Sequence, residues 1–320
     1  NIGGYEVGLD SFGEAHAQID SNVTINSRAA LRVNAFYETL ANHRDYYDGT
    51  RYGINPTLRF EAQERTTVDL SYELVDHERF IDRGIPTGTD GKPIEAFKDL
   101  FFGDTDLNYT ELEAHLLRAK VQHQFTDVLK GRLSVFYGDY DKAYSNFYAS
   151  DYNAAGSPDR VTLDGYIDTT QRENLILAGD LVGEFTTGSI GHTIVTGVEY
   201  IQTSNDNDRF NSFFDQSMDD NETFLIGQQI LRNGVGVNAN GATTNTYTDP
   251  KNDDTAADVT TFSFYLRDEI ALWENLNLVL GARFDQFDIE VLDRLSGITR
   301  SRTDEEVSPR LGLVYKPEAK

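Results

Sequence analysis

Residues 259–285 decide the fold; they read VTTFSFYLRDEIALWENLNLVLGARFD. In both arms of this stretch apolar residues alternate with polar or charged ones, as on a strand whose successive side chains point to opposite faces. The apolar set is Phe262, Phe264, Leu266, Ile270 and Leu272, then Leu276, Leu278, Leu280, Ala282 and Phe284. Each arm is about ten residues or longer, whereas strands of soluble domains are most often about five or six. A tilted strand of roughly 9 to 11 residues crosses a bilayer, so the stretch predicts a membrane hairpin.

The composition narrows the class of protein. The chain has 320 residues, no cysteine and a formal charge of -25. These values exclude a disulfide scaffold and argue against nucleic acid as a partner. The mean hydropathy is -0.48, and no apolar run approaches the roughly 18 to 20 residues of a spanning helix. A membrane barrel has such a composition, because only every second residue faces lipid and its loops are polar.

The two-faced pattern recurs along the whole chain. Besides the two arms it covers residues 5–9, 15–19, 31–37, 54–60, 68–74, 117–125, 129–137, 175–185, 194–200 and 307–315. Together these segments predict about twelve strands. No break in composition divides the chain, so residues 1–320 are expected to be part of one barrel domain.

The connections between these segments alternate in length. Those near residues 22–27, 63–65, 126–127, 186–191 and 274–275 are short, whereas 76–110, 146–172 and 203–258 are long. Short turns on one rim and long extracellular loops on the other are typical of outer-membrane barrels. The expected fold is therefore all-β: a transmembrane, antiparallel, up-and-down β-barrel with short periplasmic turns.

Large aromatic residues sort by height on the apolar face. One group is expected near the short-turn rim: Phe60, Phe125, Phe185 and Tyr315. The other is expected toward the opposite rim: Tyr37, Tyr72, Tyr137, Tyr200, Phe262 and Phe284. Two aromatic belts are the arrangement expected where amphipathic rings sit at the two membrane interfaces.

Two places break the alternation. Asp268 has the lipid-facing parity, which predicts a local bulge or a position near the interface. Beyond Asp285 the apolar parity changes to Phe287, Ile289 and Val291. This change predicts a second bulge or a strand that rises above the membrane.

Several short motifs resemble the barrel of TonB-dependent siderophore receptors. They are RYGINPTL at 51–58, DRGIP at 82–86, GD at 103–104, NYTE at 108–111, GEFTTG at 183–188, GVEY at 197–200 and SPRLGLVY at 308–315. Receptors of that family carry an N-terminal plug inside a 22-stranded barrel. The resemblance thus implies a partial barrel, about 12 of 22 strands, without the plug and its TonB-contacting segment. Open sheet edges are not tolerated in hydrocarbon, so we do not expect the fragment to work alone, and residues 316–320 are expected to form a periplasmic turn leading onward.

The resemblance also implies a function and partners. The whole protein would bind a ferric siderophore at its outer face, in a Gram-negative outer membrane, and import it when TonB, with ExbB and ExbD, displaces the plug. The chain itself would hold no cofactor. Inward-facing arginines would contact the plug, although mutually compensating charges along the wall account for most of them as well: Arg32, Arg59, Arg118, Arg267, Arg283 and Arg310.

The long loops are rich in aromatic residues. An exposed aromatic cluster can hold the apolar and π surfaces of an iron chelate, and a nearby arginine can meet its negative charge. The candidates are Tyr46, Tyr47, Arg83, Phe101, Phe102, Tyr140, Tyr144, Tyr148, Arg209, Phe213 and Phe214. Alternatively, these rings pack the loops against each other. The sequence does not choose among catecholate, hydroxamate and mixed chelates.

The sequence gives weaker support to catalysis, to metal binding and to other classes of barrel. The six histidines are scattered, and no catalytic constellation or metal-binding spacing is present, so we expect no enzyme and no metal site. His123 has the lipid-facing parity near the short-turn rim and is expected to be an interface residue. Acidic groups at 215, 219 and 220 and at 249, 253 and 254 favour a solvated surface, which also suits cation bridging to lipopolysaccharide, over a calcium site. Two other classes stay open: a complete twelve-stranded porin and a barrel lipase or protease.

Overall fold

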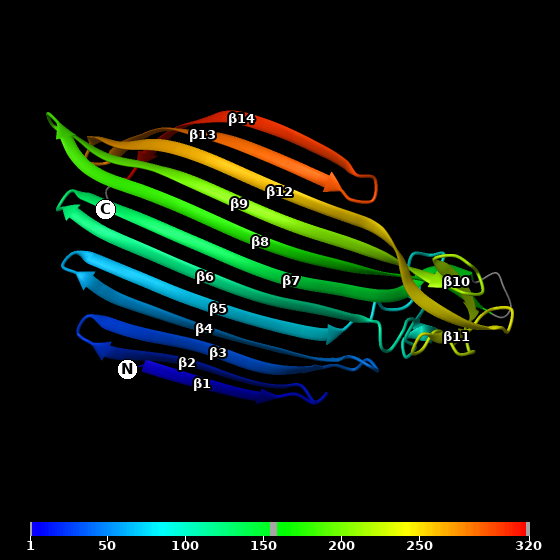
Figure 1. Cartoon of the computed structure of the whole chain (residues 1–320). Helices are drawn as coiled ribbons and strands as arrows, with labels where there is room; N and C mark the ends of the chain where they lie inside the picture. Colours follow the sequence, from blue (N-terminus) through cyan, green and yellow to red (C-terminus); the bar gives the residue numbers. More distant parts are fainter. Residues whose placement is uncertain (1, 154–158, 318–320) are drawn as a thin grey trace.

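The computed structural model describes residues 2–153 and 159–317. Most of these residues belong to one large antiparallel sheet (Figure 1). Neighbouring strands follow the chain order, β1 to β9 and then β12 to β14. The bounds are β1 Ile2–Leu9, β2 Ala15–Asn26, β3 Ala29–Ala41, β4 Asp48–Gln63, β5 Thr66–Phe80, β6 Tyr109–Thr126, β7 Leu129–Asn153, β8 Arg160–Thr187, β9 Ile190–Phe214, β12 Thr243–Trp273, β13 Leu276–Asp293 and β14 Ile298–Tyr315. Among the described residues no helix is both long and apolar enough to cross a membrane.

The short turns all lie at one rim of the sheet (Figure 1). They occupy residues 27–28, 64–65, 127–128, 188–189 and 274–275. Arg65 and Gly188 have φ angles of 65° and 63°, the left-handed conformation that tight hairpin turns require. The rim of short turns that the sequence predicts is therefore confirmed, and so is the prediction of a partial all-β barrel.

Two of the predicted long loops are mostly strand, which corrects the assignment of residues 146–172 and 203–258 as loops. β7, β8, β9 and β12 continue far beyond their apolar segments, to lengths of 25, 28, 25 and 31 residues. Above an apolar band both faces of a strand are polar, so the hydrophobic alternation that marks a strand disappears while the hydrogen-bonded ladder continues. The loop after β5 is a true connection, residues 81–108, and contains one 3-10 turn, Glu95–Phe97.

A small folded cap stands at the end of these extensions, where Figure 1 labels β10 and β11. β10 (Asn221–Leu225) pairs with β8, and β11 (Val235–Val237) pairs with β12. The cap has its own hydrophobic core, formed by Phe97, Phe102, Phe147, Val161, Leu163, Phe214, Phe224, Ile230 and Leu231. The buried core of the described chain thus lies mainly in the cap, because the sheet is a single layer and many of its apolar side chains stay exposed.

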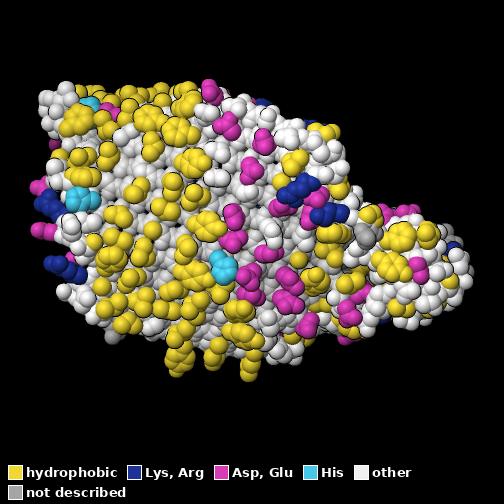
Figure 2. Space-filling view, viewed as in Figure 1, with side chains coloured by type: hydrophobic (Ala, Val, Ile, Leu, Met, Phe, Trp, Pro, Cys, Tyr) yellow, Lys and Arg dark blue, Asp and Glu magenta, His cyan; other side chains and the backbone are white. Residues whose placement is uncertain are grey.

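The two faces of the sheet differ as the sequence predicts. We call the face with the apolar parity the outer face and the opposite one the inner face. Apolar side chains of the outer face are widely exposed, for example Leu133 at 57% and Phe264 at 46%. Figure 2 shows hydrophobic side chains gathered over the short-turn half of the sheet and a band of acidic side chains between them and the cap.

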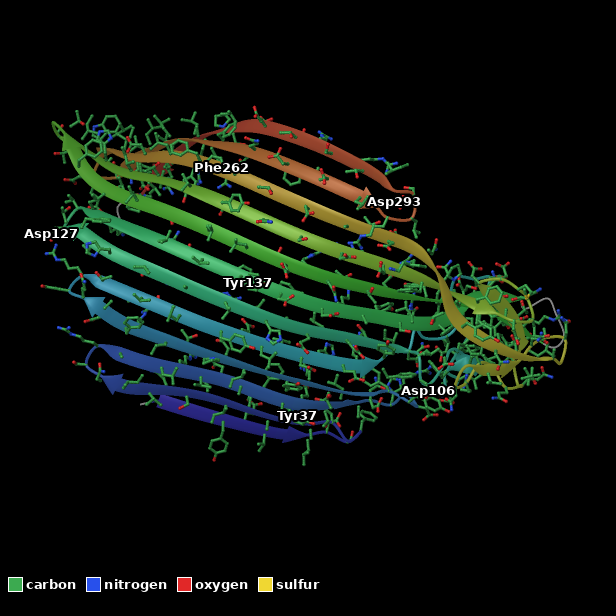
Figure 3. All side chains as sticks on the ribbon, viewed as in Figure 1. Tyr37, Asp106, Asp127, Tyr137, Phe262 and Asp293 are labelled. Atoms are coloured by element: carbon green, nitrogen blue, oxygen red, sulfur yellow. The ribbon has the colours of Figure 1, made fainter. Side chains whose placement is uncertain are left out.

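The aromatic residues lie at two heights on the outer face. Phe60, Phe125, Phe185 and Tyr315 are at the short-turn ends of β4, β6, β8 and β14. In the upper group Tyr200 pairs directly with Phe262, and Tyr72 and Tyr137 flank Leu117 in one row. Figure 3 shows Tyr37, Tyr137 and Phe262 between Asp127 at the short-turn rim and Asp106 and Asp293 at the other end.

The two exceptions to the alternation have structural explanations. The register of β12 with both neighbours runs unbroken through Asp268, so no bulge occurs there, and the nearest register shift lies between Ala271 and Trp273. Asp268 lies near the short-turn rim, and its Oδ2 is 2.8 Å from Nδ1 of His192. Beyond Asp285 the register of β13 is also unbroken, up to Asp293. The strand therefore rises without a bulge, and Phe287 belongs to the inner face.

The sheet is open along two strands. Within the described ranges β1 pairs only with β2, and β14 pairs only with β13. Nearly all of β14 is exposed. The backbone N–H of Lys316 donates to the carbonyl of Asn275 at 2.8 Å, while residues 318–320 of the expected turn lie outside the described part.

Candidate ligand site on the inner face

An arginine and tyrosine cluster lies on the inner face of the strand extensions, above the apolar band. Tyr144 and Tyr148 come from β7, Tyr166 from β8 and Arg209 from β9, and all share the inner-face parity. Arg83 reaches the same place from the β5–β6 loop. We call these five residues the inner-face cluster. Four of them are sequence candidates, and the structure brings them together.

The rings and guanidinium groups of the cluster are in direct contact. The Tyr166 ring centroid lies 6.2 Å from that of Tyr144 and 6.3 Å from that of Tyr148. The guanidinium carbon of Arg83 is 4.6 Å from the Tyr148 centroid, and that of Arg209 is 4.4 Å from the Tyr166 centroid. Cations over aromatic faces at such distances are stabilised by the ring quadrupole. The cluster is therefore held together before any ligand arrives.

The two arginines differ in their charge balance. Arg209 makes a bidentate pair with Asp168, at 2.6 and 2.7 Å, and this hydrogen bonding raises its pKa above the ordinary value. Arg83 donates to neutral acceptors, Oδ1 of Asn146 at 2.8 Å and the Tyr166 hydroxyl at 3.4 Å. In the part of the chain that the structure describes, Arg83 forms no ion pair. Its positive charge is thus available to an anionic ligand.

A cavity of about 590 Å³ lies beside the cluster. Its lining includes Tyr144, Asp168 and Arg209, together with Lys142 and Asn207. A volume of this order suits a small-molecule ligand, and a few convergent polar groups beside aromatic rings are typical of such sites.

Burial in the cap separates three other candidates from this cluster. Phe101, Phe102 and Phe214 are 3%, 1% and 0% exposed. Phe102 and Phe214 belong to the cap core, and Phe147 and Phe214 have the opposite parity to Tyr144 and Tyr148. Their rings pack the cap, which is the alternative that the sequence left open.

The remaining candidates are dispersed. Tyr46 is about half exposed, and its ring lies 5.6 Å from that of Phe101. Tyr47 is half-buried in the β3–β4 loop. Tyr140 is lower on β7, and Phe213 lies 6.2 Å from Tyr247 in the cap region. None of these four contacts the inner-face cluster through a ring or hydrogen-bond contact of the described residues.

Sequence reasoning missed three residues of the site: Asn146, Tyr166 and Asp168. All three lie in the stretch that was predicted to be a loop. The signal was present nevertheless, because Val161 and Leu163 alternate with Asp164 and Tyr166 as in a strand.

The inward-facing arginines mostly pair with acids of the wall. Five of the six candidates have a carboxylate partner: Arg32 with Asp20, Arg59 with Asp69, Arg118 with Glu73, Arg267 with Glu269, and Arg283 with Glu199 and Asp285. Arg310 forms no ion pair with the described residues. Mutual compensation is thus the observed arrangement for five of them, and contact with a plug stays a prediction.

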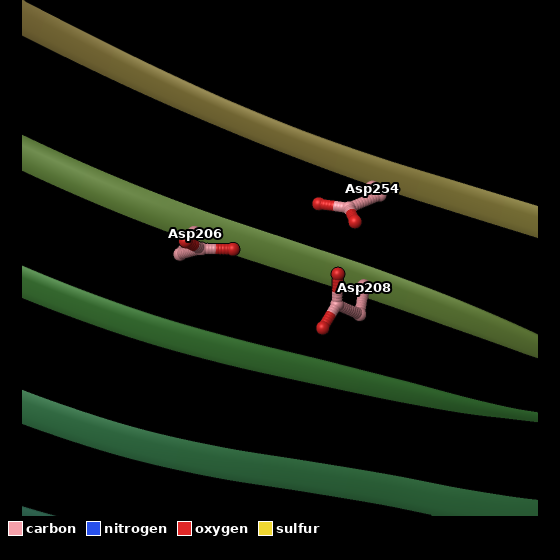
Figure 4. Close-up of side chains that lie close together, drawn as sticks. All are labelled: Asp206, Asp208 and Asp254. Carbon is pink, nitrogen blue, oxygen red and sulfur yellow. The ribbon is translucent and has the colours of Figure 1, made fainter. Parts of the chain in front are cut away.

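One acidic triad has metal-like geometry. Oxygen atoms of Asp206, Asp208 and Asp254 lie within 4.8 Å of one another (Figure 4). Nζ of Lys251 lies 3.0 Å from Asp208 and 3.1 Å from Asp254. Arg294 pairs with Asp206 at 2.5 Å and with Asp254 at 2.9 Å. Two cationic side chains therefore offset most of the negative charge of the triad.

The acidic groups considered for calcium serve local structure where they are described. Asp215 accepts hydrogen bonds from the Asn245 backbone N–H at 2.9 Å and the Thr244 hydroxyl at 3.1 Å. Asp219 accepts one from the backbone N–H of Asp220 at 2.9 Å. The side chain of Asp249 lies outside the described part.

Two bacterial receptors align with almost the whole chain. It is 24% identical to the metal-pseudopaline receptor CntO of Pseudomonas aeruginosa over 96% of this chain and 42% of that protein. It is also 24% identical to the probable TonB-dependent siderophore receptor PiuA of Acinetobacter baumannii over 98% of this chain and 44% of that protein. The chain therefore spans less than half the length of these relatives.

The fold agrees with solved receptor structures. The crystal structure of PiuA from Acinetobacter baumannii matches 99% of this chain and 47% of its own, with a TM-score of 0.77 and 21% identity. The ferripyoverdine receptor of the outer membrane of Pseudomonas aeruginosa matches 99% of this chain and 40% of its own, with a TM-score of 0.79 and 15% identity. A family model described as TonB dependent receptor-like, beta-barrel, matches residues 20–319. The chain belongs to the family of TonB-dependent receptor-like β-barrels.

Proposed function

We propose that the complete protein is a receptor of the Gram-negative outer membrane that binds a ferric siderophore and imports it with energy supplied through TonB. The ligand binds at the inner-face cluster. Iron enters as cargo inside its chelator, and the chain holds no resident cofactor.

The inner-face cluster carries this proposal. It presents three aromatic rings and the guanidinium of Arg83, which forms no ion pair with the described residues, and its members Tyr144 and Arg209 line a cavity of about 590 Å³. Aromatic faces suit the π and apolar surfaces of a chelate, and the arginine suits its negative charge. The relatives support the ligand class, because PiuA is described as a probable siderophore receptor and CntO as a metal-pseudopaline receptor. Both are named receptors, which agrees with the expectation that the chain is not an enzyme.

The proposed protein partners are inferred from the family, and the proposed lipid partner is inferred from the charges on the outer face. TonB, with ExbB and ExbD, acts through a plug held against the inner wall, where Arg310 offers a free charge. Lipopolysaccharide meets the acidic band of the outer face through divalent cations. In that band Glu113, Asp139, Asp141 and Glu173 line a pocket of about 550 Å³ above the apolar band (Figure 2).

Binding by variants of the full-length receptor tests the ligand site. The Tyr166→Ala substitution removes the central ring, and we expect a loss of affinity of about tenfold for the ferric siderophore that the wild type binds, as for a buried aromatic anchor. The Tyr166→Phe substitution keeps the ring and loses only the hydroxyl that accepts from Arg83, so its loss is smaller. Isothermal titration with ferric catecholate, hydroxamate and mixed chelates identifies the ligand.

The control is Tyr137→Ala, which removes a ring of similar size from the outer face of the neighbouring strand. We expect its affinity to equal that of the wild type. If Tyr166→Ala binds every chelate as tightly as the wild type does, the inner-face cluster is not the ligand site.

A further inference from the structure

An apolar groove of about 500 Å³ crosses the outer face of the sheet from β6 to β12. Gly179, which has no side chain to fill the space, forms its floor, whereas the Phe125 ring covers Gly131. Its walls are the apolar side chains of Phe125, Leu133, Leu181, Val198 and Phe264. The groove is continuous with the outer-face apolar band, so lipid rather than water surrounds it in a membrane.

The register of the strands gives the groove a direction. Leu133, Gly179, Val198 and Phe264 stand opposite one another in one row that crosses β7, β8, β9 and β12. Phe125 lies at the short-turn end of β6, whereas Phe264 lies well inside β12. Strands of membrane barrels are tilted by about 35–45°. The row therefore rises obliquely, from the short-turn rim into the middle of the apolar band.

A polar group marks the rim end of the groove. His123 lines the groove, and its Nδ1 lies 2.7 Å from the Thr66 hydroxyl. Its ring packs edge-on against Phe125, with centroids 4.7 Å apart. The described residues give Nε2 no hydrogen-bond partner. When the hydroxyl donates to Nδ1, Nε2 carries the proton and can donate to an anion.

A cation lies next to this end, in a turn outside the groove lining. Arg65 occupies the adjacent β4–β5 turn, its side chain is half exposed, and it lies 3.0 Å from Asp127 of the β6–β7 turn. An arginine at a membrane rim can bind phosphate with its planar set of donors. The rim end of the groove thus offers donors for phosphate, and its other end offers only apolar walls.

We propose that the groove binds a phospholipid of the leaflet on the short-turn side. One acyl chain lies over Gly179, between Leu133 and Val198, and the phosphate accepts hydrogen bonds from His123 and from Arg65 of the adjacent turn. Lipopolysaccharide of the opposite leaflet does not fit the groove in this way. Its phosphates lie beyond the upper aromatic belt, far from the donors at the short-turn rim. This lipid site goes beyond siderophore import and rests only on the proposed placement of the sheet in the outer membrane.

A pair of glycine variants in the full-length receptor tests the groove. Gly179 and Gly183 are both outer-face positions of β8. A Cβ atom at Gly179 would have its nearest neighbours at 3.9–4.0 Å, and one at Gly183 at 3.6 Å, so both positions accept a side chain. Gly179→Ile fills the groove, whereas Gly183→Ile, outside the lining, leaves it open.

The measurement is native mass spectrometry of receptor purified from its membrane in mild detergent. We expect the wild type and Gly183→Ile to retain a phospholipid. In Gly179→Ile its occupancy falls by about tenfold, which corresponds to about 1.4 kcal/mol. His123→Ala lowers retention as well, and His123→Gln, which keeps a donor, lowers it less.

Three results would overturn the proposal. The first is that Gly179→Ile retains as much phospholipid as the wild type does. The second is that the groove retains lipopolysaccharide instead of a phospholipid. The third is that added diacylglycerol, which has no phosphate, binds as tightly as added phosphatidylglycerol. Siderophore binding is measured on the same preparations. Because Gly179 is remote from Tyr166, that binding stays unchanged in Gly179→Ile, and failure of the lipid site is distinguishable from failure of the proposed function.

Discussion

At the scale of single residues, Gly197 and Tyr265 show how the inner wall is assembled. They pair directly across β9 and β12, and the Tyr265 hydroxyl donates to Asp180 on β8, the next strand. The ring therefore lies across the glycine. A Cβ atom at Gly197 would come within 2.5 Å of the Tyr265 oxygen and 2.7 Å of the Gly179 carbonyl oxygen.

This contact makes Gly197→Ala a destabilising substitution. The added methyl group must displace a ring that bridges two strands, and such overpacking costs about 1–3 kcal/mol. We expect a lower urea midpoint for the full-length receptor. Gly191→Ala on the same strand is the control, because its Cβ would be 3.6 Å from its nearest neighbour, and an equal midpoint for both variants would contradict the explanation.

The carboxyl of Asp164, which accepts a hydrogen bond from the Tyr148 hydroxyl, makes the stability of the cap region depend on pH. Burial raises the pKa of its carboxyl above 3.8, although the Gly165 N–H and the Tyr148 hydroxyl donate to it. Between the unfolded and the raised folded pKa the folded state binds more protons, so stability falls as the pH rises through that window. We expect Asp164→Asn to remove this decline in thermal melts from pH 4 upward. A decline of the same size in the variant would show that other groups cause it.

At the scale of elements, the extensions of β7, β8, β9 and β12 and the cap form a unit distinct from the membrane wall. The wall is a single layer, while the cap packs residues from several segments around a buried core. Phe214 is central to this core, and its ring centroid lies 6.1 Å from that of Phe147 and 6.3 Å from that of Phe224.

We therefore expect Phe214→Ala to loosen the cap and spare the wall. Loss of a fully buried phenylalanine costs about 3–5 kcal/mol, and hydrogen exchange of β10 and β11 should accelerate while that of residues 190–200 stays slow. Phe213→Ala is the matched control, because Phe213 is on the same strand with the opposite parity and is less buried. Uniform acceleration along β9 would show that the cap and the wall open together.

At the scale of the whole molecule, two unpaired edges limit what these residues can do alone. The backbone groups of β1 and β14 that point away from the sheet have no strand to bond with in the described structure. Unpaired edges are templates for association and cannot remain in hydrocarbon. In a membrane, both edges would therefore need further pairing partners.

Refolding residues 1–320 by themselves in detergent tests this expectation. We expect edge-to-edge oligomers in size-exclusion chromatography, whereas the full-length receptor elutes as a monomer. A monodisperse monomer of the isolated chain that conducts ions in planar bilayers would instead support the twelve-stranded porin.

The sequence by itself determined the membrane part of this protein. Lipid on one face and a polar interior on the other impose a period of two, and this local pattern was sufficient to find every strand of the main sheet and the rim of short turns. It did not reveal the extensions, because above the apolar band neither face needs to be apolar. In residues 146–172 and 203–258 the alternation is therefore limited to short pieces, such as that around Val161 and Leu163.

Only the tertiary structure decided which aromatic residues gather in the inner-face cluster and which pack in the cap. Phe102 and Phe214 belong to the cap core, whereas Tyr144, Tyr148 and the missed Tyr166 meet Arg83 on the inner face. Arg83 and Tyr166 are 83 positions apart in the chain. Their contact depends on the register of the strands between them, and a one-residue slip would turn every such side chain to the other face. No local pattern contains that information.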